Sequence, residues 1–294
     1  MDNNAAETSH WSGMSARYAA YTPPLRISPS ERNSYFELAS QWQTEQQRSG
    51  KHPGAPPRVL VLGATPDFYY LPWPAGTDLL AVDHSADMLA AIWPGSSKQR
   101  LCADWSTMNL PDASRDVMLC DGGYTFISSP EPLRRMAENV ARILAPGGRF
   151  VVRLFVNAEQ QETPAELFRA LELGSILTIS ELKLRLWLAL NGRQKGTANV
   201  AGGKGVRLVD VWRCFQAEYK SPELLDERVS WSDDSLWQSM QAYEDKIDTY
   251  YFPSVDEVSQ AFLQTTFKLE KVALVEPQVH CGQHLRLLSL KRPG

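Results

Sequence analysis

The stretch VLVLGATPDFYYLPWPAGTDLLAVD, residues 59–83, contains two apolar runs that are joined by a turn, and it ends on an acid. A continuous apolar run is typical of a strand that is covered on both faces in a parallel sheet. The turn after the first run holds a single glycine, Gly63, followed by Ala64, Thr65 and Pro66. Loops that bind nucleotide phosphates are rich in glycine. Two interpretations are therefore open: an altered cofactor loop, or a buried strand with an ordinary turn.

The alternation of apolar strand and amphipathic helix continues along the chain. The runs RLCAD (100–104), SRDVMLCD (114–121) and RFVVRLF (149–155) predict three more strands. SADMLAAIW predicts a helix capped by Ser85, and PEPLRRMAENVARIL predicts a helix that the glycines of APGG end. Strands that alternate with helices form a parallel sheet with right-handed crossovers. The sequence therefore predicts an α/β fold with a wound sheet.

The segments on either side of this core follow other patterns. SERNSYFELASQW predicts a helix that Ser30 caps. After Asn157 the alternation ends, and the leucines of ISELKLRLWLAL alternate as in a strand but also fit a helical face. The length of this run, with Ser180 as a cap, favours a helix. VRLVDVWRCFQAEY predicts a further helix, whereas FKLEKVALVEP and HLRLLSLKR predict two C-terminal strands.

The composition argues against several classes of protein. The net charge of −4 lacks the basic surplus of proteins that bind nucleic acid through its phosphates. The four cysteines have no paired spacing, which argues against a disulfide framework and fits a reducing cytosol. No apolar run approaches the roughly 18 residues that cross a bilayer, and the polar N-terminus is not a secretory signal. We therefore expect a cytoplasmic protein without a membrane or nucleic-acid partner.

Three acids follow predicted strands of the sheet. Asp83, Asp104 and Asp121 end the second, third and fourth strands. In wound sheets, ligands bind at the carboxyl ends of the strands. Asp83 comes 20 residues after Gly63, a separation at which a carboxylate can accept hydrogen bonds from both hydroxyls of a ribose. A nicotinamide cofactor is disfavoured, because its pyrophosphate would need the glycines that are absent.

These segments resemble the class I S-adenosylmethionine-dependent methyltransferases over roughly residues 58–155. VLVLGATPDF stands at the first strand and glycine loop, AVDHSADML at the ribose-binding strand end, and CADWSTMNLP at the segment beside the adenine. LAPGG before a strand is the most family-like string in the chain. The resemblance implies a Rossmann-like fold, S-adenosylmethionine as the cofactor and S-adenosylhomocysteine as the product.

The resemblance also assigns roles at the strand ends. It implies that Asp83 binds the ribose, that Asp104 binds the adenine amino group, and that Met88 and Trp105 pack on the adenine face. Asp121 would lie near the methyl-bearing end of the cofactor. Apolar packing suits the purine, and carboxylates suit the donors around it. The cofactor-binding residues predicted in the core are Gly63, Ala64, Thr65, Asp83, His84, Met88, Ala103, Asp104, Trp105, Asp121 and Gly122.

The glycine loop departs from the family pattern, which is acid-x-Gly-x-Gly-x-Gly. Val61 stands at the acidic position, and Gly63, Thr65 and Asp67 stand at the three glycine positions. The acid that helps to hold the amino group of the cofactor is therefore missing, and Pro66 removes a backbone donor. S-adenosylmethionine carries no phosphate, so a full set of backbone amides is not required. We interpret the turn as an altered cofactor loop.

Residues outside the core are candidates for the remaining contacts. The resemblance also implies an N-terminal arm that folds over the cofactor, with Trp11, Tyr18 and Arg26 as the candidates and Arg26 paired to its carboxylate. Simple surface packing is the alternative. A protonated nucleophile needs a general base. The candidates for this base are Tyr124, His280 and His284. The segment HCGQH has no fourth ligand nearby, so we expect no metal site.

We predict an α/β chain with a Rossmann-like wound sheet, mostly parallel with an antiparallel C-terminal strand, and a helical lid insertion. Its parts are an N-terminal arm and helix (1–57), a cofactor-binding core (58–156), a helical substrate lid (157–255) and C-terminal strands that complete the sheet (256–294). The acidic charge and the aromatic lid favour methyl transfer to an O or N atom of a small molecule. A protein or RNA methyltransferase and a non-catalytic, methyltransferase-like scaffold are the alternatives, and no motif indicates an oligomeric state.

Overall fold

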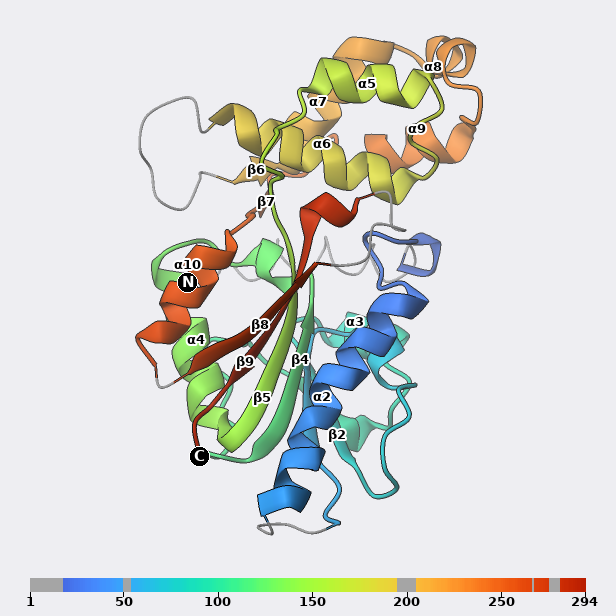
Figure 1. The fold of residues 1–294 in the computed structure, drawn as a ribbon. Helices are drawn as coiled ribbons and strands as arrows, with labels where there is room; N and C mark the ends of the chain where they lie inside the picture. Colours follow the sequence, from blue (N-terminus) through green and yellow to red (C-terminus); the bar gives the residue numbers. More distant parts are fainter. Residues whose placement is uncertain (1–17, 50–53, 195–204, 266, 275–280) are drawn as a thin grey trace, which may run out of the picture.

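A seven-stranded sheet lies at the centre of the computed structural model, which describes residues 18–49, 54–194, 205–265, 267–274 and 281–294 (Figure 1). The strands are arranged in the order β3-β2-β1-β4-β5-β9-β8. Their bounds are β1 Arg58–Leu62, β2 Asp78–Asp83, β3 Arg100–Cys102, β4 Arg115–Asp121, β5 Leu144–Phe155, β8 Lys268–Leu274 and β9 Leu285–Lys291. Strands β1 to β5 are parallel, and β9 runs antiparallel to both β5 and β8. The expected mostly parallel sheet with an antiparallel C-terminal strand is confirmed.

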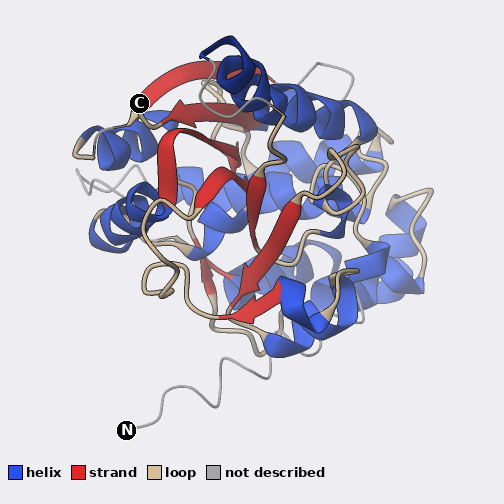
Figure 2. Ribbon diagram, turned by 90° about the horizontal axis from the view of Figure 1, so that it is seen from below, coloured by secondary structure: helices blue, strands red, loops and turns tan. Residues whose placement is uncertain are grey.

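Helices cover both faces of this sheet (Figure 2). Alternate residues of each central strand point to opposite faces, so Val59 and Val61 of β1 pack on one side and Leu60 and Leu62 on the other. The first side is covered by α2 (Pro29–Ser49) and α3 (Ala86–Ile92). The second side is covered by α4 (Glu131–Ile143) and α10 (Val255–Leu263). Burial on both faces explains why these strands are apolar throughout.

Two helix starts test the predicted caps. In α3, the Ser85 hydroxyl accepts a hydrogen bond from the amide of Met88, as expected. Helix α2 begins one residue before the predicted cap Ser30, and its cap is Ser28, whose hydroxyl accepts from the amide of Glu31. The Glu31 carboxylate accepts in return from the Ser28 amide at 2.7 Å. This reciprocal pair satisfies two free amides, so the helix starts at Pro29.

Two further expectations at helix ends are wrong. Helix α4 ends at Ile143, and the APGG segment already belongs to β5, because Leu144 leaves the helix in an extended conformation without a glycine cap. In α6 (Ile179–Gln194), the hydroxyl that accepts from the Glu181 amide is that of Thr178. Ser180 lies inside the helix, and its hydroxyl accepts from the amide of Thr22 at 3.0 Å. The helical interpretation of ISELKLRLWLAL is nevertheless confirmed.

A separate group of helices stands over the carboxyl ends of the strands (Figure 1). We call it the helical cap. It contains α5 (Pro164–Glu172), α6, α7 (Leu208–Tyr219), α8 (Pro222–Arg228), α9 (Asp234–Gln241) and the short strands β6 (Val206–Arg207) and β7 (Thr249–Tyr250). Most of its aromatic residues pack into a core of their own, and Trp212, Phe215 and Tyr219 are examples. The division of the chain into four parts stays a prediction.

Helices that could cross a bilayer do not occur in the part of the chain that the structure describes.

Candidate functional site

An inner cavity of about 140 Å³ lies where β1, β2 and β4 end beneath the helical cap. From the sheet side it is lined by Gly63, Asp83 and Asp121, and from the cap by Trp187 and Tyr250. The parallel strands bring their carboxyl ends to one edge, which is why residues far apart in the sequence meet here. The predicted residues that line this cavity are Tyr18, Gly63, Ala64, Thr65, Asp83, His84, Met88, Trp105, Asp121 and Gly122.

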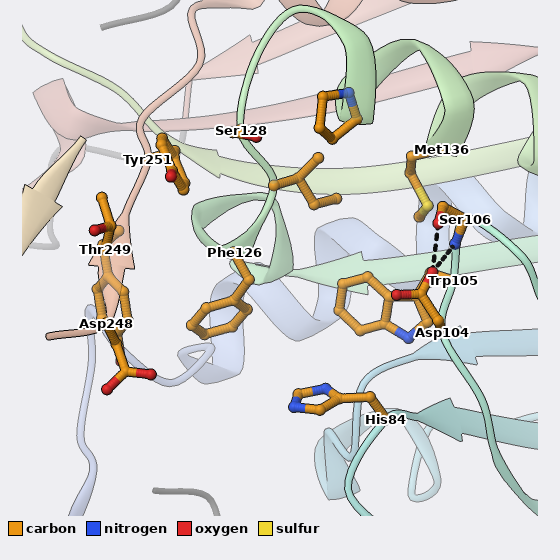
Figure 3. A pocket seen from close by; sticks show the side chains of 13 residues that line it. His84, Asp104, Trp105, Ser106, Phe126, Ser128, Met136, Asp248, Thr249 and Tyr251 are labelled. Atoms are coloured by element: carbon orange, nitrogen blue, oxygen red, sulfur yellow. Dashed lines mark hydrogen bonds between the residues drawn. The ribbon is translucent and has the colours of Figure 1, made fainter. Parts of the chain in front are cut away.

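An outer cavity of about 470 Å³ adjoins the inner one (Figure 3). Figure 3 shows His84, Asp104 and Trp105 on one side of it and Asp248 and Tyr251 on the other. The residues that line both cavities are His84, Trp105, Phe126 and Tyr250. The two cavities are therefore neighbouring parts of one site between the core and the cap.

The loop after β1 makes its turn with one glycine. Gly63 has a φ of +99°, a left-handed conformation that favours glycine, and its amide donates to the carbonyl of Val82. Thr65 is extended (φ −89°, ψ 98°), as expected for a residue before proline, and Pro66 starts the 3-10 helix η2 (Pro66–Phe68). The loop is therefore shaped by a proline-led helical turn where the family pattern has two more glycines.

Asp83 is held by the backbone around it. One carboxylate oxygen accepts from the Ala64 amide at 3.2 Å, and the other accepts from the Ser85 amide at 2.9 Å. The Nδ1 atom of His84 lies 3.4 Å from the carboxylate. Burial raises the pKa of Asp83, and these amide hydrogen bonds oppose the increase. A carboxylate has about four acceptor positions, so both oxygens can still accept from ligand hydroxyls.

Trp105 lies across the ends of β1 and β4. Its indole nitrogen donates to the carbonyl of Val82 at 2.8 Å, and its backbone carbonyl accepts from the Asn139 amide group at 2.7 Å. A Cβ atom added at Gly123 would come within 2.6 Å of the indole, so only a glycine fits beneath this ring. The neighbouring Asp104 is exposed and accepts from the amide of Ser106 at 2.7 Å.

Asp121 belongs to a buried ionic network. Its carboxylate accepts from the guanidinium of Arg153 at 2.5 and 3.2 Å, and Arg153 also donates to Glu31 at 2.5 Å. The pKa of Asp121 is raised to about 6, because burial outweighs the attraction of Arg153 and because Glu31 and Asp67 repel the charge. The pKa of Arg153 is raised overall, because the attraction of the two carboxylates outweighs the opposing effect of burial. The guanidinium therefore stays charged.

The N-terminal arm contributes differently from the expectation. Tyr18 lines the inner cavity, and burial raises the pKa of its phenol, so it stays neutral. Arg26 is paired with Asp67 through two hydrogen bonds of 2.9 and 3.2 Å, and it lies 5.6 Å from the centre of the Tyr18 ring. Its guanidinium is therefore held by a protein carboxylate in this structure. Trp11 lies outside the described residues.

Comparison with protein families decides what kind of domain contains this site. Residues 60–152 match the family model described as a methyltransferase domain, and this range runs from β1 to β5. The chain carries a methyltransferase domain. The Rossmann-like sheet expected from the sequence is confirmed, and the match to this domain agrees with the S-adenosylmethionine-dependent class expected from the sequence.

Solved structures that are similar to this chain share little sequence with it. The N-methyltransferase NodS from Bradyrhizobium japonicum WM9, solved with S-adenosyl-L-homocysteine, is 10% identical and has a TM-score of 0.49, with 96% of this chain and 98% of that chain covered. An S-adenosylmethionine-dependent methyltransferase from Mesorhizobium loti is 16% identical (TM-score 0.43; coverage 87% and 100%). The glycopeptide N-methyltransferase MtfA, complexed with S-adenosylhomocysteine, is 15% identical (TM-score 0.45; coverage 87% and 90%). No curated protein matches the sequence.

The structure places two of the three predicted bases, Tyr124 and His284, away from both cavities. Tyr124 is buried in the apolar core, with its ring 6.3 Å from that of Phe150 between centroids. Burial raises its pKa well above the ordinary value. His284 is also buried, its Nδ1 lies 3.2 Å from the carbonyl of Val156, and burial lowers its pKa. His280 lies outside the described residues, and among those that are described no group of metal-binding side chains occurs.

Sequence reasoning did not identify two parts of the methyltransferase site. One is the ionic partner of Asp121, although Arg153 interrupts the buried run RFVVRLF, and a charge inside such a strand needs a nearby counter-charge. The other is the set of cap and arm residues over the inner cavity, which includes Tyr21, Trp187 and Tyr250. The sequence showed that the lid is aromatic, but it did not separate its cavity-lining members from its core.

Ala103 lies directly after β3, its amide donates to the carbonyl of Asp83, and it is half-buried without lining either cavity.

Proposed function

We propose that the protein transfers a methyl group from S-adenosylmethionine to an O or N atom of a small molecule bound between the core and the helical cap. The observation that supports this proposal is the position of the two cavities. They join acids at the strand ends to an aromatic wall of the cap. A concave site between two walls of this kind suits a small molecule.

The residues present suit this cofactor. Asp83 offers acceptors to the ribose hydroxyls, Asp104 offers an acceptor to the adenine amino group, and Met88 and Trp105 offer apolar surface to the purine. Bound S-adenosylmethionine supplies an activated methyl group on a sulfonium. The inner cavity lies next to Asp121, so the methionine part of the cofactor would be held at that end.

The protein contributes to methyl transfer mainly by positioning and by exclusion of water. Transfer from a sulfonium requires the nucleophile, the methyl carbon and the sulfur in one line. Tyr21, Trp187 and Tyr250 form the side of the inner cavity that faces the strand ends. These rings would hold the nucleophile opposite the sulfonium and keep water out. Tyr250 makes an edge contact with Trp187 at 5.0 Å between centroids, which fixes both rings.

The charge around the cavities favours a small molecule over RNA. Among the described residues that line them there is no lysine or arginine, whereas Asp83, Asp104, Asp121 and Asp248 are present. A groove for RNA carries basic side chains along the phosphate backbone.

Titration calorimetry with S-adenosylmethionine and S-adenosylhomocysteine tests the first part of the proposal, and we expect micromolar binding of both. A panel of amines, phenols and carboxylic acids, followed by detection of S-adenosylhomocysteine, tests the second part. Turnover of a small nucleophile would support the proposal. A folded protein that binds neither cofactor form would instead be a methyltransferase-like scaffold, and turnover of protein or RNA alone would contradict the small-molecule substrate.

A further inference from the structure

Glu31, Arg153 and Asp121 form an ionic trio inside the protein. The exposed fractions of their side chains are 1%, 0% and 6%. With all three groups ionised, two carboxylates face one guanidinium, and the trio carries a net charge of −1. An uncompensated charge out of contact with water is costly, so a site of this kind favours binding of a cation.

Asp121 is the member of the trio that faces the inner cavity. Glu31 and Arg153 do not line it, and the second oxygen of Glu31 accepts from the Ser28 amide at the start of α2. No lysine or arginine of the described chain lines the cavity. Arg26 of the arm is paired with Asp67, and Lys183 lies over the rings of Tyr21 and Tyr243. The protein therefore holds an excess negative charge at one wall of the inner cavity.

The strand β1 carries no acid that could bind a cation at this end of the cavity. Val61 is fully buried in β1 and packs with residues of α2 and α3. Tyr35 donates to the carbonyl of Cys120 at 2.6 Å, so the backbone at the end of β4 already has a partner. The carboxylate of Asp121 is therefore the strongest acceptor for a cation at this end of the cavity.

We propose that the Asp121 carboxylate, kept in place by Arg153 and Glu31, binds the ammonium group of the methionine part of S-adenosylmethionine. This inference rests on the proposed function. It assigns the contact with the ammonium group to the end of β4, because β1 has no acid that could make it. A charge-assisted hydrogen bond from the ammonium would neutralise the trio. Burial raises the pKa of Asp121, and a bound ammonium group would lower it again.

The affinities for three ligands distinguish a role of Asp121 in ammonium binding from a role in folding. S-adenosylmethionine and S-adenosylhomocysteine contain the ammonium group, whereas 5′-methylthioadenosine has the same nucleoside without the amino-acid part. In Asp121→Asn we expect the affinities for the first two to fall about 10- to 100-fold, the range for loss of one charged hydrogen bond. The affinity for 5′-methylthioadenosine should stay within about twofold of wild type.

Two further variants complete the test. Asp116→Asn is the matched control, because Asp116 lies at the other end of β4, is buried and is paired with Arg58 at 2.8 Å. It should change the affinity for none of the three ligands. Glu31→Gln neutralises the trio without altering the cavity wall, and it should weaken only the two ligands with an ammonium group, by less than Asp121→Asn does.

The possible results are distinguishable. Failure of wild type to bind any of the three ligands would refute the proposed function. If wild type binds them and Asp121→Asn weakens 5′-methylthioadenosine as much as S-adenosylmethionine, the role of Asp121 is structural and this inference is overturned. The same holds if Asp121→Asn leaves all affinities unchanged. If Asp121→Asn does not fold, Glu31→Gln decides between the same outcomes.

Discussion

The strands β2 and β4 end on the same kind of side chain at the same edge of the sheet, but the two carboxylates are held in different ways. Asp83 accepts hydrogen bonds from two neutral amides, those of Ala64 and Ser85. Asp121 is paired with the buried guanidinium of Arg153. The first arrangement orients a carboxylate through its own loop, and the second supports it from a neighbouring strand.

This difference matters for what each acid can bind. Amide dipoles stabilise the Asp83 charge while free acceptor positions remain, which suits neutral donors such as hydroxyl groups. The bond from Asp83 to Ala64 also ties the loop after β1 to β2, and this tie helps to define a turn that has lost two glycines. The Asp121 network keeps a net negative charge, which suits a cation.

The largest effect should come from removing the acid of β2. Asp83→Ala deletes the acceptor that we propose for the ribose, and it leaves the amides of Ala64 and Ser85 without their partner. Loss of two hydrogen bonds to a charged group should weaken S-adenosylmethionine about 100-fold or more, measured by calorimetry. Asp78→Ala is the control, because Asp78 lies at the opposite end of β2 and forms an exposed pair with Arg115. An Asp83→Ala protein with wild-type affinity would contradict the role of the β2 acid.

A decrease in pH should weaken ligand binding at Asp121 more than at Asp83. Asp121 has a raised pKa of about 6, with Arg153 on β5, Glu31 on α2, Asp67 on η2 and Tyr18 on the arm around it. By the proposal above, the ionised carboxylate binds the ammonium group, so affinity should be nearly full at pH 7 and above and should fall by about tenfold between pH 7 and pH 5. Burial also raises the pKa of Asp83, so protonation of this carboxylate would weaken binding in the same direction.

Asp121→Asn should flatten this pH profile, and so should the use of 5′-methylthioadenosine in place of the cofactor. Calorimetry in buffers of equal ionic strength provides the measurement. A wild-type profile that is as flat as that of Asp121→Asn would show that the carboxylate does not contribute its charge to binding.

A steric change beneath Trp105 should have a smaller effect, and this effect is on the stability of the protein. Gly123→Ala places a Cβ about where the indole rim lies, so the ring must tilt away from the ends of β1 and β4. We expect a decrease of roughly 1 kcal/mol in the free energy of unfolding, the low end for an overpacked site. Urea unfolding measures this decrease. Trp105→Phe shortens the ring, so Gly123→Ala should cost less in that background, and equal costs would contradict the contact.

The smallest effect should come from the exposed acid after β3. Asp104→Asn keeps an oxygen for the Ser106 amide, and it loses only the charge that we propose to face the adenine amino group. We expect the affinity for S-adenosylmethionine to fall about threefold, as for an interaction open to water. Asp87→Asn in the first turn of α3, outside both cavities, is the control. A loss as large as that of Asp83→Ala would mean that the outer cavity closes over Asp104.

The sequence by itself determined the central sheet and the edge that carries the site. Apolar runs and amphipathic helices are local patterns, and parallel strands bring their ends to one edge whatever the details of packing. Asp83, Asp104 and Asp121 could therefore be placed at that edge from the sequence, and the single Gly63 marked the turn. The antiparallel C-terminal strand also followed from local patterns.

Only the tertiary structure decided which distant groups meet. The pairing of β4 with β5 places Asp121 beside Arg153, and this register depends on the whole sheet. Arg26 could face a ligand or a protein carboxylate, and the position of η2 selects Asp67. Tyr124 follows a strand end but points into the apolar core. Such contacts depend on packing between segments far apart in the chain, and no local sequence pattern encodes that packing.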